Sequence, residues 1–263
     1  MAHEPESNRT PRFWRDRQGV IMPEPVRRWF LPRIDPLTNL FLVLPVYLFY
    51  QLGVLFTLRR GPSGAYQWVG NGVDFLTGTL LSLSGGSLAV YAGVTSAVGA
   101  ALGGLTLWAR RRSKLSPRLF IPVVIESGVY ALLMAAGVGA LVSSLGLGVL
   151  DGLSLPAQWV SSAGAGLHEE LVFRLGLFHG LAYLAVPRLG RWAGWSLALV
   201  VSATLFSAMH YLGPLGDRLT VESFVFRLFL GIVLSGVYRF RGFAIAVWTH
   251  FLYDVLYFSL RAS

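Results

Sequence analysis

The stretch LTNLFLVLPVYLFYQLGVLFTL, residues 37–58, decides the fold, because it contains no charged side chain along its whole length. A helix of about 20 apolar residues is long enough to cross the hydrocarbon core of a bilayer, which is about 30 Å thick. Comparable apolar runs recur at 121–150 and 192–212. A water-soluble core does not need runs of this length, so the sequence predicts an integral membrane protein.

The composition of the chain agrees with this interpretation. Of its 263 residues, 54% are hydrophobic and 13% are charged, whereas about 25% are charged in a typical soluble domain. The apolar runs are continuous and lack the alternation of barrel strands, so helices are the expected spanning elements and the predicted fold class is all-α. The chain has no cysteine, which excludes disulfides, thiolate metal ligands and cysteine nucleophiles.

Glycine, proline and charged residues divide the chain into a predicted set of seven transmembrane helices. Their approximate ranges are 37–58, 75–109, 120–150, 157–187, 192–212, 222–239 and 242–260. The sequence Ser84-Gly85-Gly86-Ser87 would raise the number to eight if it split the second helix into two spans. We expect three regions: a basic cytosolic tail over 1–36 that is disordered, N-terminal transmembrane helices over 37–150, and a motif-bearing core over 151–263.

The net charge of +9 comes from basic clusters between the apolar runs. In the seven-helix arrangement, the tail, the 110–118 segment and the arginine pairs near 188–191 and 239–241 all fall on one side of the membrane. The positive-inside rule assigns that side, and with it the N-terminus, to the cytoplasm. We therefore interpret the positive charge as a topology signal, and nucleic-acid binding is not expected.

Ionisable residues inside three of the late spans are the candidates for function. A charge in a membrane span costs about 2.5–3.5 kcal/mol on insertion scales, so each one suggests a functional site. The residues concerned are Glu169, Glu170 and Arg174 in the fourth helix, His210 with Phe206 in the fifth, and His250 and Asp254 in the seventh.

Helical spacing suggests how these residues pair. Glu170 and Arg174 stand four apart and can form an ion pair, whereas Glu169 points about 100° away. His250 and Asp254 also stand four apart, so the carboxyl group could fix the imidazole tautomer or share a ligand with it.

Each pairing also has a purely structural interpretation. The Glu170 pair alone could be a packing ion pair, and a single His210 could be an interfacial residue. Together, Glu169, His210 and His250 favour a site, and we predict that they converge within one polar cavity. The other histidines, His3, His168 and His179, are assigned no catalytic role.

The ordered motifs give the site a family resemblance. Glu-Glu-x-x-x-Arg at 169–174, Phe-x-x-x-His at 206–210, a helix with Phe229, Gly231 and Gly236, and His-x-x-x-Asp at 250–254 follow one another in that order. This set, over about 150–262, resembles the CAAX-protease and bacteriocin-processing (CPBP, Abi) family of intramembrane peptidases, which includes the myxosortase branch.

The resemblance implies roles for individual residues. Glu169 would activate a water molecule together with His210, and His250 with Asp254 would stabilise the oxyanion, while Glu170, Arg174 and Phe206 would support them. Prenyl-protein proteases of the family have Asn where Asp254 stands, and a carboxyl group donates a hydrogen bond only when protonated. The family has been described both as metal-free and as metal-dependent. We expect no required cofactor, and in the alternative Glu169, His210 and His250 would bind zinc.

The same resemblance implies a peptide substrate from a membrane-associated, lipidated or exported protein, and the lipid bilayer as the surroundings. The expected location is the bacterial inner membrane. Other intramembrane proteases fit less well: His-Glu-x-x-His fails at Val172, and no Gly-x-Gly-Asp of the presenilin type follows Tyr253-Asp254. Ser84-Gly85-Gly86-Ser87 is a poor copy of the rhomboid-type Gly-x-Ser nucleophile. A non-enzymatic scaffold or bacteriocin-immunity protein on the same fold remains the alternative.

Overall fold

The computed structural model of the protein describes most of the chain and divides it into two units. The described residues are 13–15, 21–23, 34–60, 66–67, 75–109, 117–142, 154–212 and 216–261. The first unit is Met1–Ile34, in which β1 (Phe13–Arg15) and β2 (Ile21–Pro23) pair antiparallel. Most of the tail that was predicted to be disordered lies outside the described residues.

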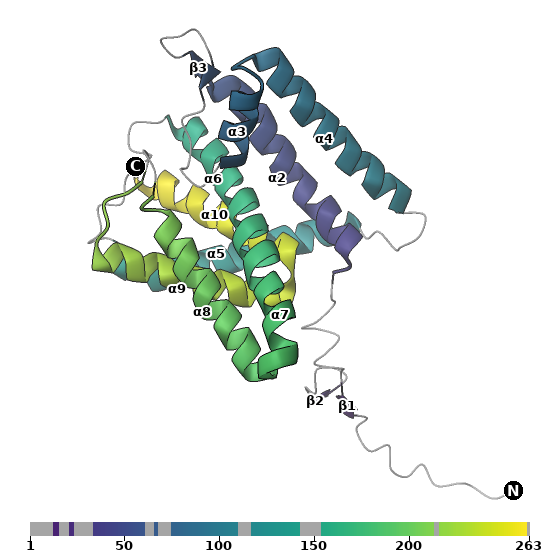
Figure 1. Cartoon of the computed structure of the whole chain (residues 1–263), viewed down its shortest axis with the longest axis vertical. Coiled ribbons are helices and arrows are strands. Elements are labelled where there is room, and N and C mark those ends of the chain that lie inside the picture. Colours follow the sequence, from purple (N-terminus) through teal and green to yellow (C-terminus); the bar gives the residue numbers. More distant parts are fainter. Residues whose placement is uncertain are drawn as a thin grey trace, which may run out of the picture. The chain divides into compact units, whose positions relative to one another are not determined.

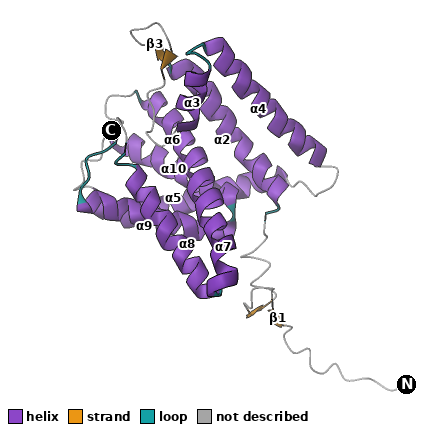
Figure 2. Ribbon diagram, in the orientation of Figure 1, coloured by secondary structure: helices purple, strands orange, loops and turns teal. Residues whose placement is uncertain are grey.

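The second unit, Asp35–Ser263, is helical, as predicted (Figure 1, Figure 2). Besides a short antiparallel pair of β3 (Arg59–Arg60) and β4 (Tyr66–Gln67) and the 3-10 turn η1 (Pro117–Leu119), its elements are helices. These are α2 (Pro36–Thr57), α3 (Phe75–Leu83), α4 (Leu88–Ala109), α5 (Phe120–Val142), α6 (Leu155–Glu169), η2 (Glu170–Phe178), α7 (His179–Leu189), α8 (Arg191–Met209), α9 (Val221–Arg241) and α10 (Phe243–Arg261).

Seven helical segments among the described residues are long and apolar enough to cross a membrane. The predicted helix over 75–109 is in fact two helices, because the chain turns at Gly85 and Gly86, which have φ of 62° and 71°. The first of the two, α3, has nine residues, or about 14 Å at 1.5 Å per residue, too short to cross the bilayer. The break therefore occurs without adding an eighth span.

The fourth span also differs from the predicted α-helix. It runs continuously from Leu155 to Leu189, but its middle part, η2, is a π-helix. At its end the backbone N–H of His179 donates to the carbonyl of Arg174, five residues earlier, as a π-helix requires. Such segments are rare and are frequently found at functional sites.

Helix α10 lies at the centre of the bundle and contacts α5, α6, α9 and α2 (Figure 1). Its first half is almost completely buried from Ala244 to His250. The buried apolar residues around it include Phe173, Phe206, Phe226, Leu230 and Tyr253 from several helices. The site residue His250 therefore lies in a buried stretch of the central helix.

Small residues let α6 approach its neighbours closely. A Cβ on Gly166 would lie 3.0 Å from the carbonyl oxygen of Val247 on α10, and one on Gly164 would lie 2.5 Å from the ring of Tyr50 on α2. The same applies to α8 and α9, where a Cβ on Gly231 would lie 3.1 Å from the Cα of Ala203. These contacts bring the backbone that carries the glutamates against the helix that carries His250.

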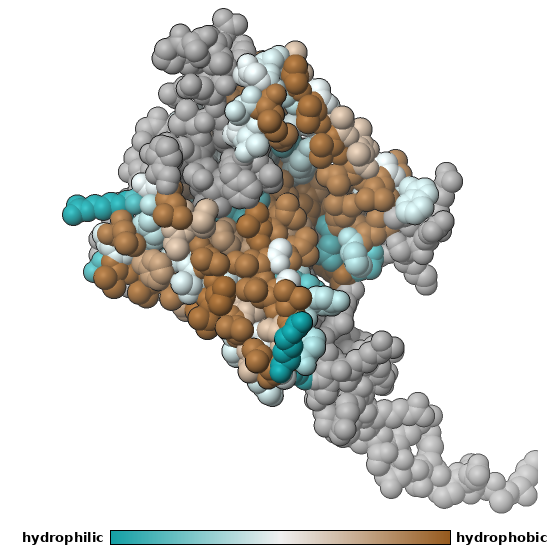
Figure 3. Space-filling view, viewed as in Figure 1, coloured by the Kyte–Doolittle hydropathy of each residue, from teal (hydrophilic) through white to brown (hydrophobic). Residues whose placement is uncertain are grey.

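The outer surface of the bundle is apolar. Large side chains such as Leu107, Ile121, Leu133 and Val200 are exposed on α4, α5 and α8. Figure 3 shows hydrophobic residues covering most of the described surface in view. This is the surface expected of helices that face lipid, where burial of polar groups and exposure of apolar ones are both favourable.

Candidate active site

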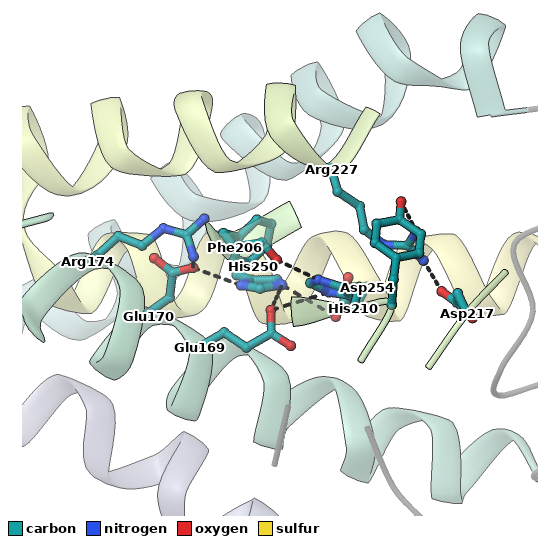
Figure 4. Close-up of polar contacts among 10 residues, drawn as sticks. Glu169, Glu170, Arg174, Phe206, His210, Asp217, Arg227, His250 and Asp254 are labelled. Atoms are coloured by element: carbon teal, nitrogen blue, oxygen red, sulfur yellow. Dashed lines mark hydrogen bonds and ion pairs between the residues drawn. The ribbon is translucent and has the colours of Figure 1, made fainter. Parts of the chain in front are cut away.

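The two glutamates lie where α6 changes into the π-helix. Glu169 is the last residue of α6 and Glu170 the first of η2, and both are buried, with 1% and 0% of their surface exposed. Carboxylates so deeply buried require partners, because an isolated buried charge is very costly. Each of them indeed faces charged or ionisable groups from other parts of the fold (Figure 4).

Glu170 lies between Arg174 and His250. Its Oε1 is 3.1 Å from Arg174 Nη1, which is the predicted ion pair, and 2.8 Å from His250 Nδ1. The hydrogen bond from Nδ1–H to the carboxylate fixes the ring of His250, so that Nε2 points away from Glu170. Helical spacing left open whether Asp254 fixes this imidazole or shares a ligand with it, and in the structure Glu170 is the carboxylate bound to Nδ1.

The Nε2 atom of His250 faces two other carboxylates. It lies 3.7 Å from Oε2 of Glu169 and 3.7 Å from Oδ2 of Asp254. These separations are too long for direct hydrogen bonds. They are short enough for strong electrostatic interaction, and they leave the nitrogen directed toward the space between the two carboxylates.

His210 approaches Glu169 from the end of α8. Its Nδ1 lies 2.8 Å from the backbone carbonyl of Phe206, one turn earlier, so Nδ1 carries the proton that is donated. The Nε2 atom lies 3.9 Å from Oε2 of Glu169. One water molecule could contact both atoms across such a distance. The structure thus brings Glu169, His210 and His250 together, each within 4 Å of a common carboxylate oxygen.

The ring of Phe206 packs among the charged groups of the site. The guanidinium carbon of Arg174 lies 4.1 Å from its centroid, and the rings of His210 and His250 lie 5.0 and 6.1 Å away. Among the described residues, the Nε and Nη2 atoms of Arg174 have no hydrogen-bond partner. The face of the Phe206 ring therefore supplies part of the stabilisation of that cation.

The acidic and imidazole groups of the site are also candidate metal ligands. In the part of the chain that the structure describes, no group of three His, Asp or Glu side chains is placed to hold a metal ion. Glu169, His210 and His250, the ligands expected if zinc were bound, do not form such a site as they stand.

Sequence reasoning missed a second group of polar residues next to the site. Arg227 on α9 forms an ion pair with Asp217 (Figure 4) and donates hydrogen bonds to Tyr211 and Ser223. The signal was present, because Arg227 is a charge inside the predicted 222–239 span, to which the same rule applies. A further ion pair, between Glu126 on α5 and Arg241 on α9, was also not predicted.

Carboxylates and imidazoles buried together inside a bundle of apolar helices are groups that can act as acid and base in the hydrolysis of a peptide bond. Residues 151–256 match the family model described as Rce1-like, type II CAAX prenyl endopeptidase Rce1-like. This part of the chain is thus similar to the CAAX-protease (CPBP) family, and the match supports, at the level of class, an intramembrane protease that acts on a membrane-associated peptide. No curated protein and no solved structure matches the chain.

Proposed function

We propose that the protein is an endopeptidase in which Glu169 and His210 activate a water molecule. The observation that carries this proposal is the position of Glu169 Oε2, buried and 3.9 Å from His210 Nε2 and 3.7 Å from His250 Nε2. A carboxylate held in a desolvated site beside an imidazole acceptor is suited to general-base chemistry.

The proposed reaction has two steps. The water donates hydrogen bonds to Glu169 and to the unprotonated Nε2 of His210, gives a proton to Glu169, and its oxygen attacks the scissile carbonyl carbon. The tetrahedral intermediate then collapses, the carbon–nitrogen bond breaks, and Glu169 returns the proton to the leaving nitrogen. The products are a new carboxyl terminus and a new amino terminus.

His250 and Asp254 are proposed to bind the oxyanion of the intermediate. Because Nδ1 of His250 is held by Glu170, a proton on Nε2 makes an imidazolium whose N–H is directed toward the reacting atoms. Preorganised donors of this kind stabilise developing negative charge strongly in a site that excludes water. Asp254 contributes a donor in its protonated form.

The proposed substrate is the C-terminal part of a membrane-associated or exported protein, cleaved in the manner of sorting-signal or CAAX processing. We place the protein in the bacterial inner membrane with its basic connections in the cytoplasm. In this orientation α8 runs from the cytoplasmic to the outer face, so His210 at its C-terminal end lies near the outer face. This orientation favours an exported substrate, as in the myxosortase branch, over a prenylated cytosolic one.

A proteome comparison tests the proposal. We compare the membrane and secreted proteins of three kinds of cell: those with the wild-type protein, those that lack it, and those with the Glu169→Gln variant. The matched control is Glu222→Gln, which changes an exposed acid on α9. We expect a C-terminally trimmed product with the wild type and the control only. If Glu169→Gln accumulates in the membrane and still yields that product, Glu169 is not the base. If the absence of the protein has an effect but changes no protein terminus, the scaffold or immunity role is favoured.

A further inference from the structure

His210 lies just beyond the last residue of α8, at the start of the loop that follows the helix. Its Nδ1 lies 2.8 Å from the carbonyl of Phe206 on α8, and the loop that follows makes further contacts with the residue. The carbonyl of His210 accepts a hydrogen bond of 2.9 Å from the backbone N–H of Asp217. This contact joins Asp217 to the residue that faces Glu169, so a group that fixes Asp217 also helps to hold His210.

Arg227 on α9 contacts two residues of the connection between α8 and α9, Tyr211 and Asp217. Its Nη2 forms an ion pair with Asp217, and its Nη1 donates a hydrogen bond of 2.9 Å to the hydroxyl of Tyr211, the neighbour of His210. The guanidinium also lies 5.1 Å from the centroid of the Tyr211 ring. Ser223, one turn earlier on α9, joins the same group through the Tyr211 hydroxyl at 2.8 Å.

The burial of Arg227 within a membrane span indicates that its contacts have a functional role. The residue is 8% exposed and lies in a candidate membrane span, where an arginine costs about 2.5–3.5 kcal/mol on insertion scales. A loop with no functional demand could end in a turn without a buried cation. The planar guanidinium can bind a carboxylate and a hydroxyl at fixed angles, which a lysine does less well.

We propose that Arg227 is a positioning residue: by binding Tyr211 and Asp217 together it fixes the loop that presents Nε2 of His210 to Glu169. The proposal rests on the proposed function in so far as His210 takes part in catalysis. Arg227 itself does not take part in the reaction. Its removal is expected to disturb the place of His210 while leaving the remaining site residues, which lie on α6, η2 and α10, where they are.

The test measures the loop and the catalysis separately. The variants are Arg227→Gln, Arg227→Lys and Asp217→Asn, and the control is Arg239→Gln, an arginine on the same helix whose guanidinium packs on Trp195 at 4.4 Å. The first measurement is hydrogen–deuterium exchange of peptides covering 210–217, together with modification of His210 by diethyl pyrocarbonate. The second is kcat and KM on internally quenched peptides with prenylated or plain apolar C-termini.

We expect faster exchange of the loop and faster modification of His210 in Arg227→Gln and Asp217→Asn, with no change in Arg239→Gln. The kcat should fall about 10–100-fold, the range for a misplaced catalytic group, with KM within about twofold of the wild-type value, and Arg227→Lys should recover part of kcat.

Two results would overturn the proposal. One is unchanged exchange and modification of the loop in Arg227→Gln, and the other is a rise in KM with kcat preserved, which would place Arg227 in substrate binding. A mobile loop in Arg227→Gln, combined with full activity of Glu169→Gln, would support the positioning of the loop and contradict the proposed function instead.

Discussion

At the scale of single residues, the ion pair between Glu170 and Arg174 has two separable effects. Both side chains are completely buried, so Arg174→Ala leaves an uncompensated charge, which costs about 3–5 kcal/mol in comparable buried pairs. We expect a marked loss of folded protein in detergent extracts. The double variant Glu170→Gln/Arg174→Met carries no buried charge at these positions, and its folded yield should recover.

Activity should behave differently in that double variant. Glu170 also holds His250 through Nδ1 at 2.8 Å, so removing the carboxylate releases the imidazole even when stability is restored. Quenched-peptide assays on the solubilised double variant should therefore show a strongly reduced kcat. Full activity in the double variant, or full abundance of Arg174→Ala, would show that the pair is incidental to the site.

Asp254 provides a second residue-scale prediction. Its Oδ2 lies 3.7 Å from His250 Nε2, where an amide would have an N–H donor at every pH, whereas a carboxyl group donates only when protonated. We expect Asp254→Asn to retain kcat, and its kcat should fall less toward high pH than that of the wild type. Asp254→Ala should lower kcat. A pH–rate profile of the two variants checks this, and loss of activity in Asp254→Asn would exclude the donor role.

The residues of the candidate site could be predicted from the sequence because charges inside membrane spans are few and costly. The sequence indicated Glu170 with Arg174 correctly, since residues four apart share a helix face. It could not indicate that His250 is bound by Glu170, because that contact depends on how α6 and α10 pack. Arg227 was missed although the same cost argument applied to it.

At the scale of elements, the close approach of α6 and α10 depends on Gly166. A Cβ there would lie 3.0 Å from the backbone of Val247 and Phe251, so a larger side chain must push the helices apart. We expect Gly166→Val to lower the melting temperature and to abolish proteolysis by moving the glutamates away from His250. Gly180→Val is the control, since a Cβ at Gly180 meets nothing within 4 Å. Equal behaviour of the two variants would contradict this account.

The elements themselves were predictable to different degrees. Helices α9 and α10 are marked by two long apolar runs separated by Gly242, whose φ of 100° favours glycine. The break at Gly85-Gly86 was foreseen as an alternative, but its outcome depended on the length of α3. The π-helix was not foreseen, because its apolar pattern does not differ from that of an α-helix over so short a segment.

At the scale of the whole molecule, the seven spans predict that the two chain ends lie on opposite sides of the membrane. With the basic connections in the cytoplasm, α10 runs outward and its last residue, Arg261, lies outside. A reporter that is active only outside the cytoplasm should give a signal when fused after the C-terminus. The same reporter inserted at Gly242, between α9 and α10, should give none, and the reverse pattern would place the site toward the cytoplasm.

Because η2 is a π-helix, the number of residues between Glu170 and Arg174 determines how the chain continues into α7. Each residue of a regular helix advances the chain by about 100°. Deleting one residue between Glu170 and Arg174 would let the π-helix become an ordinary α-helix, and it would rotate α7 away from its present neighbours. Replacing Leu171 or Leu175, which are 40% and 44% exposed, changes only what lipid touches. In divergent relatives, the residue types at positions 171 and 175 are therefore expected to vary, whereas the η2 segment is expected to contain neither insertions nor deletions.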